Sequence, residues 1–96
     1  MIASFADRAT DALFHGEAGK TIRKIPPAIR SVAVRKLDLL NAAHELQDLR
    51  VPPGNRLEAL KGELRGKHSI RINDQWRIVF RWRDGDAHEV EIDDYH

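Results

Sequence analysis

The fold follows most directly from the stretch SIRINDQWRIVFRWRDGDAHEVEIDDYH, residues 69–96, in which apolar and charged residues alternate. Alternation is typical of half-buried strands, because successive side chains of a strand point to opposite faces of the sheet. The clusters 73–75 and 84–86 interrupt the alternation with residues that favour turns. The stretch therefore predicts three antiparallel strands, at residues 68–72, 76–82 and 87–93.

The positions of the large apolar residues set the register of these strands. They are all even-numbered: Ile70, Ile72, Trp76, Ile78, Phe80, Trp82, Val90 and Ile92. They share one face of the sheet if both loops contain three residues. This register pairs Ile70 with Ile78, Ile78 with Ile92, and Phe80 with Val90. We expect the main helix to pack on this face, which places both tryptophans in the core.

Charged residues fill the opposite face in this register. Arg71 lies across from Arg77, Arg77 across from Asp93, and Arg81 across from Glu89. The last of these pairs has the form of an ordinary cross-strand ion pair. Two facing arginines repel one another, and two explanations of this unfavourable pair remain open. Either Asp93 relieves the repulsion, or the arginine pair binds an anion such as phosphate.

The last three residues, Asp94, Tyr95 and His96, follow the last predicted strand beside this cluster, and Lys61 is placed to point toward it. Cations stabilise the charge that develops on a phosphoryl group, while a phenol and an imidazole transfer protons. The imidazole suits this role near neutral pH, because the ordinary pKa of histidine is about 6.5. The group therefore fits phosphodiester chemistry. The alternative for His96 is a frayed surface residue at the chain end.

The first half of the chain predicts two helices. Asp7 is suited to cap the start of a short helix that ends at Gly16. Pro26-Pro27 opens the main helix, since proline is tolerated in a first helical turn. Apolar residues at helical spacing continue this helix to an end between residues 43 and 46.

Two short strands complete the predicted domain. They cover residues 2–5, as an edge strand, and residues 56–62, after the loop signal VPPGN. The connector at residues 17–27 is charged and poor in apolar residues, which favours mobility. The order of elements is β-α-α-β-β-β-β, so we expect an α+β fold in a single domain over residues 1–96.

Composition narrows the possible functions. The 96 residues contain no cysteine, which excludes disulfides and thiolate metal sites and suits a reducing cytoplasm. No apolar run approaches the roughly 18 residues that span a bilayer. The net charge is +1, but six acidic and no basic residues lie in 84–96, whereas six basic and no acidic residues lie in 18–37. The histidines match no metal-ligand spacing such as HExxH, so we expect no metal site.

Several motifs together resemble the HigB-type toxins of the RelE/ParE superfamily. They are IASFADRATDALFHG (2–16), VPPGNRLEALKG (51–62), SIRINDQWRIVFRW (69–82), DGDAHEVEI (84–92) and the terminal DYH (94–96). The resemblance covers almost the whole chain. It implies a compact RelE-like fold with two N-terminal helices against an antiparallel sheet. It also implies a bacterial type II toxin that is held in a hetero-oligomer by a HigA-like antitoxin with a helix-turn-helix domain.

The resemblance further implies a ribosome-dependent endoribonuclease that cuts mRNA in the ribosomal A site, without a metal or other cofactor. In this chemistry a ribose 2′-hydroxyl attacks the adjacent phosphate. The residues that match the catalytic positions of the family are Glu58, Lys61, Arg77, Asp94, Tyr95 and His96. Candidate contacts to RNA or phosphate are Arg56, Arg71 and Arg81.

The chain departs from the family pattern at two positions. Glu58 stands where some relatives carry a catalytic histidine, and a carboxylate has a lower ordinary pKa and no positive charge. Asn73 stands at another family arginine, with Arg71 nearby. These departures leave an alternative, a non-catalytic ParE-like toxin that binds DNA gyrase. Lys61 and the terminal DYH favour the nuclease, because a protein that only binds has no need of them.

Overall fold

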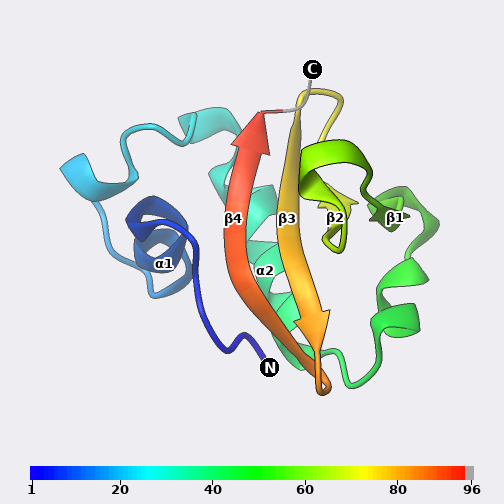
Figure 1. The fold of residues 1–96 in the computed structure, drawn as a ribbon. Helices are drawn as coiled ribbons and strands as arrows, with labels where there is room; N and C mark the ends of the chain where they lie inside the picture. The colour runs from blue at the N-terminus through cyan, green and yellow to red at the C-terminus, as the bar shows by residue number, and fades with distance from the viewer. Residues whose placement is uncertain (95–96) are drawn as a thin grey trace.

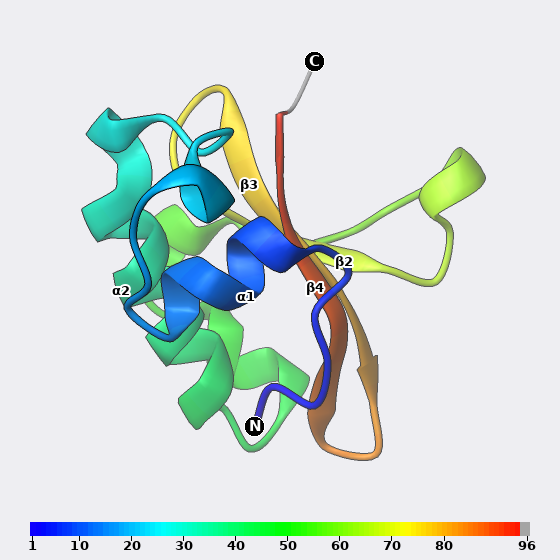
Figure 2. The same cartoon turned by 90° about the vertical axis from the view of Figure 1, so that its left-hand side faces the viewer.

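The computed structural model describes residues 1–94, which form two α-helices, five short 3-10 helices and an antiparallel sheet in the order β1-β2-β3-β4. The elements are α1 (Arg8–Phe14), η1 (Lys20–Ile22), η2 (Pro27–Ile29), α2 (Arg30–Ala42), η3 (Leu46–Arg50), η4 (Pro53–Asn55), β1 (Glu58–Ala59), η5 (Gly62–Leu64), β2 (His68–Arg71), β3 (Trp76–Arg83) and β4 (Asp86–Asp94). Helix α2 lies behind the sheet and α1 beside β4 (Figure 1). Both helices lie on the same side of the sheet (Figure 2), as the α+β prediction requires.

Helix α1 forms where the sequence predicts it, because both of its ends are specified. The side chain of Asp7 accepts a hydrogen bond from the backbone N–H of Thr10 at 2.9 Å, which satisfies one open donor of the first turn. Gly16 follows the helix with a φ of 77°, which glycine adopts without steric cost. The buried hydroxyl of Thr10 also accepts a hydrogen bond from the N–H of Ile92 and so ties α1 to β4.

The main helix begins later than Pro26-Pro27 predicts. Residues 27–29 form the separate 3-10 turn η2, and α2 begins only at Arg30. It ends at Ala42, just before the predicted end. At 13 residues it is the longest helix within residues 1–94, and none of these helices is long and apolar enough to cross a membrane.

The connector at residues 17–27 is packed more closely than its composition predicts. Ile22 and Ile25 are buried in the core. The guanidinium of Arg30 donates hydrogen bonds to the carbonyl oxygens of Ile25 (2.8 Å) and Ile22 (3.3 Å). These two isoleucines anchor the segment against the helices. The mobility expected from its composition takes no account of them.

The predicted register of β2 and β3 is confirmed. Ile70 pairs with Ile78, and Arg71 pairs with Arg77. The loop between β3 and β4 is shorter than predicted, because it contains only Asp84-Gly85, both with positive φ (54° and 80°). Such a two-residue turn matches the twist of its strands. Alone, it would move the apolar residues of β4 to the wrong face of the sheet.

A β-bulge in β4 reverses this shift. Glu89 and Val90 together lie opposite Phe80, so the chain gains one unpaired residue and the alternation changes phase. The predicted one-to-one backbone pairs of Phe80 with Val90 and of Arg81 with Glu89 are therefore wrong, and Arg81 pairs with His88. The predicted ion pair between the side chains of Arg81 and Glu89 is nevertheless present. Beyond the bulge the predicted pairing resumes, and the apolar residues of β4 face the helices.

The first residues lie along the outer edge of β4. They form isolated parallel bridges, Ile2 with Ala87 and Phe5 with Val90, rather than the regular edge strand that we expected. The hydroxyl of Ser4 accepts a hydrogen bond from the N–H of Glu89 in the bulge (2.9 Å). The N-terminal segment thus covers an edge that would otherwise expose unpaired backbone groups.

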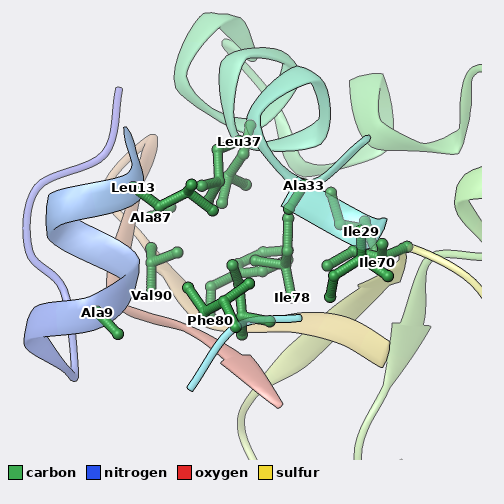
Figure 3. Packing of buried hydrophobic residues seen from close by; sticks show 14 of the residues in the cluster. Ala9, Leu13, Ile29, Ala33, Leu37, Ile70, Ile78, Phe80, Ala87 and Val90 are labelled. Carbon is green, nitrogen blue, oxygen red and sulfur yellow. The ribbon is translucent and has the colours of Figure 1, made fainter. Parts of the chain in front are cut away.

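The core lies between α1, α2 and the helix side of the sheet, where Leu37 and Ala33 of α2 face Ile78 and Phe80 of β3 (Figure 3). Burial of such side chains supplies the main favourable term in folding. Trp76 and Trp82 are only partly buried at the margin of this core. The opposite face of the sheet carries mainly polar side chains, such as those of Arg71, Arg77 and Glu91.

Candidate functional site

A pocket of about 240 Å³ lies on the sheet face opposite the helices. The strand registers place four of its lining residues, Glu58, Ser69, Arg71 and Arg77, on the other face from Ile70 and Ile78, which are fully buried in the core. The lining residues are Arg56, Glu58, Ser69, Arg71, Asn73, Asp74, Trp76 and Arg77. Four residues predicted from the sequence, Arg56, Glu58, Arg71 and Arg77, therefore meet in one place.

The facing arginines form one wall of the pocket, with Arg71 on β2 and Arg77 on β3. Arg77 also pairs with Asp93 of β4 in the backbone register, as predicted. Arg71 makes an ion pair with Asp74 in the turn between β2 and β3. Asp74 is not among the site residues predicted from the sequence, although it lies three residues from Arg71. One of the two facing arginines is thus paired with an exposed carboxylate.

Further lining residues come from the segment around the short strand β1. Arg56 has a left-handed backbone conformation (φ 45°, ψ 57°), and Glu58 begins β1 two residues later, paired with Ser69 of β2. Non-glycine residues adopt this conformation only at an energetic cost. The cavity is therefore lined by three arginines and by the carboxylates of Glu58 and Asp74. The arginines suit an anion, and a carboxylate can accept a proton from a group bound beside it.

Trp76 and Asn73 line the pocket near the turn between β2 and β3. The Oδ1 of Asn73 accepts hydrogen bonds from the backbone N–H groups of Gln75 (2.9 Å) and Trp76 (2.7 Å), which fixes the turn. Trp76 is half-buried, so it packs on the core and also lines the pocket. Its even position in the strand predicts a core residue only, because parity does not reveal that Trp76 lies at the margin of the sheet.

The end of β4 lies beside Trp76. Asp94 pairs with Trp76 in the backbone register, and its carboxylate accepts a hydrogen bond from the Nε2 of Gln75 at 3.2 Å. The predicted catalytic residues Tyr95 and His96 lie outside the described residues.

Lys61 and Arg81 are not among the residues that line the pocket. Lys61 is exposed and precedes η5, in a connection that projects from the sheet on the side away from the helices (Figure 2). Arg81 donates a hydrogen bond from Nε to Glu89 (3.2 Å), and its guanidinium packs against Gly66 of the same connection. The candidate cations thus form two groups, one in the pocket and one at the base of the η5 connection.

Burial changes the pKa of one acidic residue near the pocket. Glu91 shares with Asp93 the polar face of β4, and its pKa is raised, mainly by burial and also by the negative charge of Asp93. The charge of Lys67 opposes this shift. Within residues 1–94, no group of three or more histidine, aspartate or glutamate side chains is arranged to hold a metal ion.

Comparison with known families identifies the chain. The family described as the RelE-like toxin of type II toxin-antitoxin system HigB matches residues 3–96. The chain belongs to this HigB-like toxin family. The resemblance inferred from the sequence motifs is thereby confirmed.

Individual relatives agree with the family. The chain is 43% identical over 93 residues to Toxin HigB-1 of Vibrio cholerae, with 97% of this chain and 96% of that protein covered. It is 33% identical over 100 residues to Endoribonuclease HigB of Proteus vulgaris, with both chains fully covered. The fold is similar to that of the YoeB-YefM complex from Staphylococcus aureus, with a TM-score of 0.55, 19% identity, and 100% and 98% of the chains covered. This likeness bears on the fold alone.

Proposed function

We propose that this HigB-like toxin is an endoribonuclease that cuts mRNA on the ribosome and that the arginine-lined pocket binds the scissile phosphate. The observation that carries the proposal is the convergence of Arg56, Arg71 and Arg77 on one cavity that also holds Glu58. Guanidinium groups match the geometry of phosphate oxygens and keep their charge at any physiological pH. The name of the Proteus vulgaris relative, an endoribonuclease, supports this chemistry.

The proposed reaction needs two proton transfers and stabilisation of negative charge. The ribose 2′-oxygen forms a bond to phosphorus while the bond from phosphorus to the 5′-oxygen breaks. Glu58 is the candidate base for the 2′-hydroxyl proton, and His96 is the candidate acid for the leaving 5′-oxygen. Arg77 and Arg71 stabilise the charge on the phosphoryl oxygens. Each step uses only side chains of this chain.

The remaining candidates are assigned supporting roles. Tyr95 positions or stacks on a base, and Asp94 orients the end of β4 through its contact with Gln75. Lys61 and Arg81, at the η5 connection, contact the RNA backbone outside the pocket, because cations there attract phosphates.

The proposed partners are the ribosome, mRNA and an antitoxin. The chain belongs to a family of toxins from type II toxin-antitoxin systems, which supports an antitoxin as its neutralising partner, and we propose a HigA-like antitoxin with a helix-turn-helix domain. Such an antitoxin holds the toxin in a hetero-oligomer. We place the activity in the cytoplasm, where ribosomes and mRNA meet.

The nuclease is tested by mapping mRNA 5′ ends by primer extension in a reconstituted translation reaction. We expect new ends inside codons with the wild-type protein and ribosomes, and their loss in His96→Gln or without ribosomes. The matched control is His15→Gln, the same change at an exposed histidine of the α1 end, which should leave cleavage unchanged. Absence of new ends while cell growth is still arrested would contradict the nuclease and favour a gyrase-binding toxin.

A further inference from the structure

Asn55 is fully buried at the end of η4, and its side chain joins three parts of the chain. Its Nδ2 donates hydrogen bonds to the carbonyl oxygens of Leu49 (3.1 Å) and Val51 (3.3 Å). Its Oδ1 accepts a hydrogen bond from the Nζ of Lys36 in α2. A buried amide that is satisfied in this way fixes the loop that it belongs to, because each lost bond would leave a buried polar atom.

Lys36 has an unusual place for a lysine. It is only 8% exposed on the buried side of α2, in line with Ala33, Leu37 and Leu40. Its acceptor is a neutral amide, so the burial of the ammonium is only partly compensated. Burial lowers the pKa of Lys36, and the nearby charge of Arg35 adds to the effect. An apolar residue would fill this place at less cost, so stability alone does not account for the lysine.

The residue directly after Asn55 is Arg56, which lines the pocket. Its N–H donates a hydrogen bond to the carbonyl oxygen of Pro53 (3.1 Å), and its left-handed backbone turns the chain toward β1. A strained backbone conformation persists only when its surroundings enforce it. The anchored side chain of Asn55, the residue before Arg56, provides this constraint.

We infer that Lys36 and Asn55 are positioning residues, which hold Arg56 in the conformation that places its guanidinium at the pocket. This inference rests on the proposed function of the pocket. The contact reaches from α2, on the helix side of the sheet, to the loop that builds one wall of the site. Neither residue lines the pocket, so both act through Arg56.

The test is single-turnover cleavage of mRNA on programmed ribosomes by Lys36→Met. A misplaced Arg56 should lower the rate constant at saturating ribosomes by about 10- to 100-fold. The half-saturating ribosome concentration should change little, because most of the binding surface is intact. Lys36→Gln, which keeps a donor for the Asn55 amide, should recover most of the rate. In an Arg56→Ala background, Lys36→Met should cause no further loss.

Two further measurements separate positioning from stability. Leu13→Ala, in the buried side of α1 and away from the pocket, provides a variant with lowered stability and unchanged cleavage. Hydrogen exchange of the Asn55 and Arg56 amides, measured without ribosomes, should be faster in Lys36→Met and unchanged in Leu13→Ala.

Three results would overturn the inference: wild-type cleavage by Lys36→Met, an equal loss in Leu13→Ala, or a further loss in the Arg56→Ala background. If the wild-type protein itself does not cleave, the proposed function fails instead. Amide exchange then still decides whether Lys36 holds Arg56, and unchanged exchange in Lys36→Met would refute it.

Discussion

At the scale of single residues, Arg56 lowers the stability of the fold but contributes to the proposed function. It occupies a backbone conformation that favours glycine, yet it contributes a guanidinium to the pocket. Arg56→Gly should raise the free energy of unfolding by up to about 1 kcal/mol, because the left-handed conformation no longer strains a Cβ atom. The same change should lower cleavage, because the pocket loses a cation. Urea unfolding and single-turnover cleavage measure the two effects.

Arg56→Ala is the control for this prediction, since it removes the guanidinium and keeps the strained Cβ atom. It should lose cleavage to the same degree without gaining stability. If Arg56→Gly loses stability as well as cleavage, or keeps wild-type cleavage, then Arg56 is a structural residue and the assignment is wrong.

At the scale of elements, strand β4 shows which parts of the fold the sequence predicts. The parity of its apolar residues correctly predicts the face that Ile92 presents to the core. The prediction of a three-residue loop between β3 and β4 is wrong, although Asp84-Gly85 is a strong signal for a two-residue turn. The bulge that compensates for it leaves no local pattern, because the conformation of Glu89 is supported by Ser4, 85 residues away.

In the candidate site, too, the sequence predicts local features and does not predict those that depend on distant contacts. Pairing between adjacent strands is a local property, so the sequence predicts that Arg71 and Arg77 face one another. The separation of Lys61 from the pocket depends on β1 ending at Ala59, two residues before it. The glycines and the 3-10 turn η5 that follow redirect the chain away from the sheet. Such a change of direction depends on tertiary packing, which periodicity does not encode.

The polar face of β4 also predicts a pH dependence. The raised pKa of Glu91 means that the folded protein keeps this proton to a higher pH than the unfolded chain, whose ordinary value is 4.5. Between 4.5 and the raised pKa, the folded state binds more protons, so the free energy of unfolding falls as the pH rises. Glu91→Gln cannot ionise and should abolish this fall. Its stability should match the wild type below pH 4.5 and exceed it above the window.

Urea unfolding at a series of pH values measures this difference. Glu63→Gln, the same change at an exposed position of η5, should keep the wild-type dependence. An unchanged pH slope in Glu91→Gln would show that another group causes the dependence.

At the scale of the whole molecule, the two faces of one small sheet have separate tasks. Both helices cover one side of the sheet (Figure 2), where the core is buried. The opposite side carries the pocket, whose lining residues include members of β1, β2 and β3. Segments far apart in the sequence meet there: the loop after η4, the turn after β2 and the end of β4. The proposed catalytic group is therefore a product of the complete fold, and short peptides from it should be inactive.

The central claim is that the arginine-lined pocket performs RNA cleavage, and Arg77→Met tests it most directly. The control is Arg83→Met, the same change on the same strand at an exposed position outside the pocket. With both variants folded, the single-turnover rate on programmed ribosomes should fall about 100-fold or more for Arg77→Met, the scale of losing one charge-stabilising donor. It should stay at the wild-type value for Arg83→Met. Equal rates for the two variants would contradict the account and place the chemistry outside this pocket.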